Sequence, residues 1–412
     1  MTGPRLLDEK AQLVVVGGGL AAYAAALAAA RQGIEVLLIP DGGKSWALFG
    51  GSFAARVQTQ SEPFEALVEL YASAAYPLVA AKPAEPFVLP TTMGTVRAAD
   101  LTPEEFQAGD LRRPDPILLV GWRELPAFSP AWAAAAIRQR LVEWAGRSGD
   151  GSAAPTVLAG TLAISQVLPQ LLSGHTPVDG DYPGFNWRAL AREMEQPESR
   201  RRLASALNQA LVKADLPRPV RQARDEGRLR VALPVVGLNL SQSVRREVYD
   251  LTGLVLCELI GLLPAPGGIR AKTILDKALV SAGVAVRPGW KVTRIVAGEK
   301  PTACGRVQGT EEGFAITGEY LVLAPDLATD PLSCLAARLP HDFRQAEGRL
   351  VRAGAALYLY TDDKGKMRPV SGGTHAFLWA SGYQAGQEAA ANLVGRIDTQ
   401  AAGGSRVGEC GR

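Results

Sequence analysis

The 412-residue sequence predicts an α/β fold in which both ends of the chain build one domain and the middle forms another. Two observations predict this arrangement. Residues 13–39 give, in order, a buried strand, a glycine-rich turn, a helix and a second strand. Residues 267–324 give a helix, a strand, a short meander and a further strand, which is the order that completes such a sheet. The length suffices for two or three domains.

The composition excludes several classes of protein. The 44 basic and 41 acidic residues leave a net charge of +3, too small for the electrostatic footprint of a nucleic-acid-binding protein. With 47% hydrophobic residues, the chain is not mainly disordered. Its four cysteines form no C-x-x-C motif, which excludes a disulfide scaffold, a dithiol enzyme and a metal or iron–sulfur site of ordinary spacing. We expect a reduced, cytoplasmic protein without a metal.

Residues 11–30 contain no charge and are long enough to span a bilayer. Three consecutive glycines divide this run into a short strand and a helix, and the acidic residues before it do not suit a signal peptide. The run therefore predicts a buried βα unit rather than a membrane segment.

The glycine turn has the G-x-G-x-x-G/A spacing, with Gly17, Gly19 and Ala22 at the fixed positions. Gly17 permits a tight turn out of the strand, Gly19 has no Cβ to block a pyrophosphate, and Ala22 lets the helix pack on the sheet. Free amides at the start of the helix then face the phosphates. The alternative is an ordinary glycine turn of an α/β domain. The residues expected to bind a cofactor here are Gly17, Gly18, Gly19, Leu20, Ala21 and Ala22.

The end of the second strand departs from the dinucleotide-binding pattern. The carboxylate that binds the adenosine ribose is expected there, and this chain has Pro40, followed by Asp41. Both are cofactor-binding candidates, with Asp41 as the substitute carboxylate. A mononucleotide therefore stays open as the alternative cofactor.

The segment after the second strand favours a flavin over a nicotinamide. Residues 42–53, GGKSWALFGGSF, are rich in glycine and serine, so the backbone can approach an aromatic ring closely. A surface loop of the same composition is the alternative. The residues expected to line the flavin are Ser45, Gly50, Gly51 and Ser52.

Later segments complete the expected site. We expect the backbone of Val292 to meet the adenine, and Ala324 stands where a glycine is usual after the strand 320–324. Residues 375–394 predict a strand, a glycine turn and a long helix, whose N-terminus stabilises the negative charge of a reduced flavin. The candidates in that turn are Gly382, Tyr383 (in a position that is usually acidic) and Gly386.

These elements predict a Rossmann-like FAD-binding domain that is discontinuous, formed by residues 1–60 and 262–395. An inserted α+β cap domain covers residues 61–261, and residues 396–412 are expected to be a flexible tail. FAD is the expected cofactor, with FMN as the alternative.

The sequence resembles the family of B-type subunits of anaerobic glycerol-3-phosphate dehydrogenase over most of its length. The resemblance rests on GGGLA (Gly17–Ala21), GGSF (Gly50–Phe53), LPVVGL (Leu233–Leu238) and, most specifically, CELIGLLPAPGGIR (Cys257–Arg270). It implies a subunit with non-covalently bound FMN or FAD. It also implies partners, namely a catalytic flavoprotein subunit and an iron–sulfur subunit that attaches the complex to the membrane, so membrane association would be indirect.

The resemblance predicts a flavin-containing oxidoreductase subunit that relays electrons within a dehydrogenase or reductase complex. Arg270, after a Pro/Gly turn, is the candidate catalytic residue, because a guanidinium can bind an anionic group near the flavin; a helix cap or a salt bridge is the alternative. Lys272 and Arg56 rank below it. Two other functions stay open: a cofactor-free structural subunit of such a complex, and an independent flavin-dependent hydroxy-acid or amine oxidase.

Overall fold

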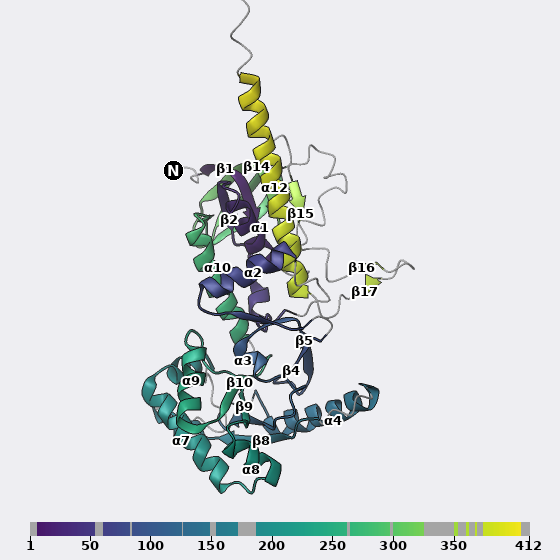
Figure 1. Ribbon diagram of the computed structural model, residues 1–412. Helices are drawn as coiled ribbons and strands as arrows, with labels where there is room; N and C mark the ends of the chain where they lie inside the picture. Colours follow the sequence, from purple (N-terminus) through teal and green to yellow (C-terminus); the bar gives the residue numbers. More distant parts are fainter. Residues whose placement is uncertain are drawn as a thin grey trace, which may run out of the picture. The chain divides into compact units, whose positions relative to one another are not determined.

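The structure is a computed structural model of the chain (Figure 1), described for residues 6–53, 61–82, 85–125, 127–148, 154–171, 187–261, 264–296, 300–324, 350–352, 360–361, 367–368 and 374–404. The chain divides into two compact units. The first comprises Met1–Trp46, Val57–Leu70 and Lys272–Arg412, and the second comprises Ala47–Arg56 and Tyr71–Ala271. The first unit is therefore built from both ends of the chain. Residues 47–56, which we expected in it, fall in the second.

A seven-stranded sheet forms the centre of the first unit, in the order β11-β2-β1-β14-β13-β12, with β15 also paired to β14. β1 pairs in parallel with β2 and, over its whole length, with β14. The strands β12 and β13 form the expected antiparallel meander. The strands are β1 (Leu6–Val16), β2 (Val36–Ile39), β11 (Ala285–Val286), β12 (Trp290–Val296), β13 (Thr302–Val307), β14 (Gly313–Leu323) and β15 (Leu350–Arg352), with a separate pair β16 (Tyr360–Thr361) and β17 (Met367–Arg368).

The expected βαβ unit is present in this sheet. β1 runs seven residues further toward the N-terminus than the apolar stretch predicts, because its polar first half pairs with β14. The helix α1 (Leu20–Ala30) then leads to β2. The remaining helices of the unit are α12 (Thr374–Gly404) and parts of η1 (Lys44–Ala47), α2 (Glu62–Ser73) and α10 (Pro266–Ser281); these last three helices each contain a unit boundary.

Residues Thr374–Gly404 form a single helix, α12, where we expected a strand, a glycine turn and a helix that ends before residue 396. That expectation was wrong because Gly382 and Gly386 lie one helical turn apart and serve a helix contact. A Cβ at Gly382 would overlap the carbonyl oxygen of Ala21 in α1, and a Cβ at Gly386 that of Ala25. Figure 1 shows α12 beside α1. The glycines therefore allow two backbones to approach closely. Residues 405–412 lie outside the described part.

The second unit contains a four-stranded, fully parallel sheet in the order β10-β9-β7-β8. We expected an α+β cap; antiparallel pairing in the described part of this unit is found in the short pairs β3–β6 and β4–β5. Helices connect the parallel strands, as such crossovers require. The strands are β3 (Leu78–Ala80), β4 (Phe87–Pro90), β5 (Val96–Ala99), β6 (Leu101–Pro103), β7 (Ile117–Trp122), β8 (Val157–Leu162), β9 (Arg230–Leu233) and β10 (Val255–Glu258). The helices are α3 (Glu104–Gln107), α4 (Pro130–Ser148), α5 (Ile164–Val167), η2 (Pro169–Leu171), α6 (Trp187–Met194), α7 (Pro197–Lys213), α8 (Arg218–Asp225) and α9 (Ser241–Thr252).

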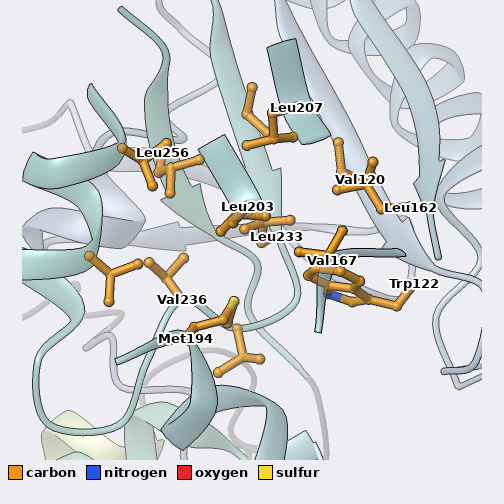
Figure 2. Close-up of a cluster of buried hydrophobic side chains, with 14 of the residues drawn as sticks. Val120, Trp122, Leu162, Val167, Met194, Leu203, Leu207, Leu233, Val236 and Leu256 are labelled. Atoms are coloured by element: carbon orange, nitrogen blue, oxygen red, sulfur yellow. The ribbon is translucent and has the colours of Figure 1, made fainter. Parts of the chain in front are cut away.

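The core of the second unit lies between this sheet and its helices. Figure 2 shows Leu203 and Leu207 of α7 among side chains of the sheet, including Val120 of β7 and Leu233 of β9. Full burial of one such side chain stabilises the fold by about 1.5–3 kcal/mol. The apolar spacing in α7 thus accounts for its position, while Arg201 and Arg202 on its other face are exposed.

The uncharged run of residues 11–30 is divided between β1 and α1, and α1 has only 11 residues. Across the described ranges, no helix has the length and apolar character needed to cross a membrane.

Candidate functional site

The turn between β1 and α1 needs glycine at its first position. Gly17 has φ +146°, and a Cβ on it would overlap the carbonyl oxygen of Ala324. The ends of three neighbouring strands meet here, because Gly17 N–H donates to Ile39 O (2.9 Å) and Ala324 N–H donates to Val16 O (2.8 Å). The structure therefore brings two expected cofactor residues, Gly17 and Ala324, to one edge of the sheet.

The N-terminus of α1 has no side-chain cap and no acidic residue that would repel an anion. Gly19 is its N-cap, with no side-chain cap, and the first turn has no acidic residue. The first amides of a helix have no partner within it and lie at the positive end of the helix dipole. Combined with the buried glycine turn, this end of α1 fits a pyrophosphate, with Leu20, Ala21 and Ala22 supplying backbone N–H groups.

Residues 42–46 lie against the same turn. A Cβ on Gly18 would lie 2.7 Å from Gly43 N, and Gly43 itself has φ +86°. Trp46 Nε1–H donates to Gly18 O at 2.7 Å, and the Trp46 ring packs edge-on against Tyr23 with centroids 5.3 Å apart. Ser45, also expected here, is buried in the same segment. This part of the glycine-rich loop therefore holds in place the glycine turn of residues 17–19, which we call the phosphate turn.

The residues expected at the adenosine end contact each other. Val292 N–H donates to Asp41 Oδ2 at 2.9 Å, and Asp41 N–H donates to Ile39 O at 2.8 Å. Pro40 follows the last residue of β2. Asp41 thus connects the end of β2 to β12 within the first unit. The backbone donor that we expected to meet the adenine is used by the carboxylate that we expected to bind the ribose.

The segment expected to line the flavin ring belongs to the second unit. A Cβ on Gly51 would lie 2.8 Å from Gly267 Cα and 3.1 Å from the Phe106 ring, and one on Gly50 would lie 2.5 Å from Ile260 Cγ2. Ser52 is fully buried, and its Oγ has no hydrogen-bond partner among the described residues. A buried hydroxyl without a partner fits a polar atom of a ligand or a water.

Gly382, Tyr383 and Gly386 lie in α12 rather than in a ribityl-binding turn. The Tyr383 hydroxyl lies 3.4 Å from Glu62 Oε1, and burial is the main cause that raises its pKa. In this structure Gly382 contacts α1 at Ala21 in its first turn and Gly386 contacts it at Ala25, so the two glycines support the helix whose N-terminus fits the pyrophosphate.

Arg270 lies in a buried ion-pair network of the second unit. Its guanidinium donates to both oxygens of Glu258 (2.9 and 2.6 Å) and to Glu105 Oε1 (3.0 Å). It also donates to the carbonyl oxygens of Gly237 and Leu238. Burial opposes its charge, but the two carboxylates outweigh burial and raise the pKa of Arg270. Each of its nitrogens has a protein acceptor, so this arrangement corresponds to the salt-bridge alternative. Lys272 pairs with Asp276 (2.7 Å), and Arg56 lies outside the described residues.

Glu105 is a functional candidate that sequence reasoning missed. Burial raises the pKa of its carboxyl to about 7; the Arg270 charge lowers that pKa and the Glu258 charge raises it. Strongly perturbed groups of this kind occur often at functional sites. No sequence signal identifies Glu105, because its neighbours in the structure are up to 165 residues away along the chain.

The raised pKa of Glu105 makes stability depend on pH. An unfolded chain loses this proton near pH 4.5, whereas the folded chain keeps it until about pH 7. The folded state therefore binds up to about one proton more in that window, so stability falls as pH rises through it. We expect urea unfolding of Glu105→Gln to lack this part of the pH dependence. Glu124→Gln changes a buried carboxylate that accepts a hydrogen bond from Ile164 N–H, and this control should keep the wild-type pH dependence. If the unfolding free energy of wild type and of Glu105→Gln changed equally with pH, the raised pKa of Glu105 would be contradicted.

Comparison with known proteins finds a family match at the N-terminal end of the chain. Residues 12–64, from β1 into α2, match the family model described as FAD dependent oxidoreductase. This N-terminal segment is similar to the FAD-dependent oxidoreductases. Its cofactor is accordingly FAD, and the matched segment contains the glycine turn whose geometry fits a pyrophosphate. No protein of curated function matches the chain.

Solved flavoenzymes are distantly similar. The 3-ketosteroid-Δ4-(5α)-dehydrogenase of Rhodococcus jostii is 12% identical, with 78% of this chain and 48% of that chain covered and a TM-score of 0.25. Glycine oxidase of Geobacillus kaustophilus is 12% identical, with 80% and 59% covered and a TM-score of 0.28. The p-nitrophenol 4-monooxygenase of Pseudomonas putida is 12% identical, with 77% of this chain and 40% of that chain covered and a TM-score of 0.25. This chain covers less than two thirds of each.

Proposed function

We propose that this FAD-dependent oxidoreductase is a subunit that relays electrons within a multi-subunit dehydrogenase or reductase complex. The observation that carries the flavin part is the buried glycine turn before the uncapped N-terminus of α1, inside the segment that matches the family model. The relay role and the partners, a catalytic flavoprotein subunit and an iron–sulfur subunit, rest on the resemblance of Cys257–Arg270 to the B-type subunits of anaerobic glycerol-3-phosphate dehydrogenase.

Different residues of this chain would bind different parts of FAD. The backbone N–H groups of Gly19–Ala22 would hold the pyrophosphate, and Asp41 and Val292 would border the adenosine. The Gly50–Ser52 segment packs within the second unit against Ile260, Gly267 and Phe106. Bound FAD supplies the capacity to accept and release electrons.

Arg270 supports a relay over a subunit with a substrate of its own. An arginine that recruits an anionic substrate needs free N–H groups, whereas this guanidinium is saturated by Glu258, Glu105 and Gly237. Removing it from those carboxylates to bind a substrate would leave buried charges unpaired, which is strongly unfavourable. This supports the proposal that a partner carries the substrate-oxidising chemistry.

A cofactor-free structural subunit is the second candidate. The packing of Gly43 and Trp46 against Gly18 and the Asp41–Val292 hydrogen bond favour it, because protein groups use positions that a nucleotide would contact. The visible absorption of the purified protein separates the two functions. A flavin spectrum and extractable FAD support the relay, and their absence from protein purified with its partners contradicts it.

Gly19→Val tests the phosphate turn directly. Gly19 has φ −96°, which any residue adopts, so the substitution obstructs the approach of a ligand without straining the backbone. We expect FAD binding to weaken at least about tenfold, equivalent to about 1.4 kcal/mol, in a fluorescence titration of flavin-free protein. Circular dichroism should stay unchanged. Ala30→Val, at the other end of the same helix, is the matched control; unchanged affinity of Gly19→Val would refute the site.

A further inference from the structure

A groove lies at the open edge of the parallel sheet in the second unit. β10 is the edge strand of this sheet, and α9 and α3 both pack against it (Figure 1). The groove has a volume of about 520 Å³ and is lined by one face of α9, by Glu104 at the start of α3, and by Val255 and Leu256 of β10. Small-molecule sites commonly have volumes of roughly 300–1,000 Å³. All of these residues belong to the second unit, so the groove is complete within it.

The open edge of β10 holds Arg245 in place. Val255 N–H donates to Leu229 O on the β9 side, so the backbone of the next residue, Leu256, points to the open side. Arg245 Nε–H donates to Leu256 O at 3.1 Å. One Nη of Arg245 lies 3.6 Å from Glu104 Oε2, close enough for an ion pair but too far for a hydrogen bond. The Nη–H groups of Arg245 are therefore positioned but have no hydrogen-bond acceptor among the described residues.

Arg246 brings a second guanidinium to the same groove. Its side chain is exposed and forms neither a hydrogen bond nor an ion pair within the described ranges. The adjacent carboxylate on α9, Glu247, pairs instead with Arg200 at 2.7 Å. The groove thus presents two arginines with free N–H groups, whereas the guanidinium of Arg270 is saturated by protein acceptors. Free N–H groups of this kind are what an anionic ligand requires.

The charge of the groove indicates how many negative charges its ligand carries. Its charged side chains, among the described residues, are Arg245, Arg246 and Glu104, which leaves a net charge of +1. A carboxylate supplies one negative charge, and its two oxygens match the fork of a guanidinium. A phosphate monoester carries nearly two negative charges at neutral pH and would lie beside the Glu104 carboxylate, which repels it. The charge balance therefore favours a monocarboxylate.

The remaining walls of the groove are suited to an apolar body. Tyr249 lies one turn after Arg245 and Arg246 on α9, and it is 48% exposed. An aromatic ring with so much free surface can pack against a ring or chain of a ligand. Val255 and Leu256 add apolar surface on the β10 side. A ligand with a carboxylate at one end and an aromatic or apolar body at the other matches both parts.

We propose that the α9–β10 groove binds a small aromatic or apolar monocarboxylate, with the carboxylate held by Arg245 and Arg246 and the body packed on Tyr249. Binding is non-covalent and transfers no proton or electron. The inference goes beyond the electron relay and does not depend on FAD, because every residue that it uses lies in the second unit, whereas the phosphate turn lies in the first. It gives the second unit a ligand-binding role of its own.

The groove is tested by titrating the full-length protein into 4-fluorobenzoate and following the ligand by fluorine NMR. We expect a dissociation constant of about 1 mM for the wild type. Arg246→Met should raise it at least about tenfold, because the charge-assisted hydrogen bonds are lost. The substitution is at an exposed, unpaired position, so circular dichroism and the unfolding midpoint should stay at wild-type values. Arg202→Met, which changes an exposed arginine of α7, is the matched control and should leave the dissociation constant unchanged.

A ligand series on the wild type tests the chemistry without any substitution. The neutral amide 4-fluorobenzamide should bind at least about tenfold more weakly than the acid, because it lacks the charge that the arginines recognise. 4-Fluorophenyl phosphate should also bind more weakly, because of Glu104. Absence of 4-fluorobenzoate binding, or equal binding to wild type and Arg246→Met, overturns the site. Equal binding of the amide overturns the role of the arginines, and tighter binding of the phosphate overturns the monocarboxylate assignment. Absence of bound flavin contradicts the proposed relay and leaves each of these outcomes decisive for the groove.

Discussion

Replacing Gly386 with leucine is expected to destabilise the protein by about 3 kcal/mol, the upper end of the usual cost of overpacking, because the side chain has no space between α12 and α1. A Cβ at this position would already overlap the carbonyl oxygen of Ala25. The neighbouring atoms are backbone atoms of a buried helix, so they cannot rotate away as a side chain does. Chemical unfolding followed by circular dichroism measures the loss as a lower midpoint.

The matched control is Gln384→Leu, which adds the same side chain to an exposed position of the same helix. We expect it to change stability by less than about 0.5 kcal/mol. Gly382→Leu should behave like Gly386→Leu, since its Cβ would overlap the carbonyl oxygen of Ala21. If both glycine variants unfold at the wild-type midpoint, α12 does not pack on α1 as described.

Arg270→Met should lower stability by about 3–5 kcal/mol, the usual cost of removing one partner from a buried ion pair. The substitution leaves Glu105 and Glu258 buried without their cation, although the methionine keeps much of the side-chain volume. The loss should shrink as the pH falls toward 5, because protonation removes the unpaired negative charges. Urea unfolding at several pH values measures both effects.

Arg202→Met is the control for this prediction, because Arg202 forms an exposed pair with Glu198 at 3.2 Å. Exposed pairs of this kind contribute about 0–1 kcal/mol. The triple variant Arg270→Met, Glu105→Gln, Glu258→Gln should recover part of the stability lost in Arg270→Met, since it removes the buried charges together. A destabilisation of Arg270→Met no larger than that of Arg202→Met would contradict the buried network.

The phosphate turn was predictable from local sequence. Its glycine spacing, the apolar strand before it and the alanine-rich helix after it all act within a few residues, and the structure confirms the strand, turn and helix at these positions. Gly17 illustrates the reason, since its positive φ and its close approach to the next strand leave no room for a Cβ. The family match to residues 12–64 covers the same segment.

The glycines near the C-terminus show where local reasoning failed. Gly382 and Gly386 are equally compatible with a turn or with a helix, because glycine permits both. What decides between them is α1, more than 350 residues earlier in the chain, whose small residues Ala21 and Ala25 accept a close helix. Sequence spacing within α12 carries no information about that partner.

The same distinction applies to the charged residues. The sequence by itself determined a dinucleotide-binding βαβ unit at the N-terminus, because steric limits on a glycine turn act between neighbours. Only the tertiary structure decided that Arg270 is saturated by Glu258 and Glu105, and that burial raises the pKa of Glu105. Both properties follow from burial and from charges supplied by α3, β10 and α10, and the free energy of a buried charge depends on its neighbours in space rather than along the chain.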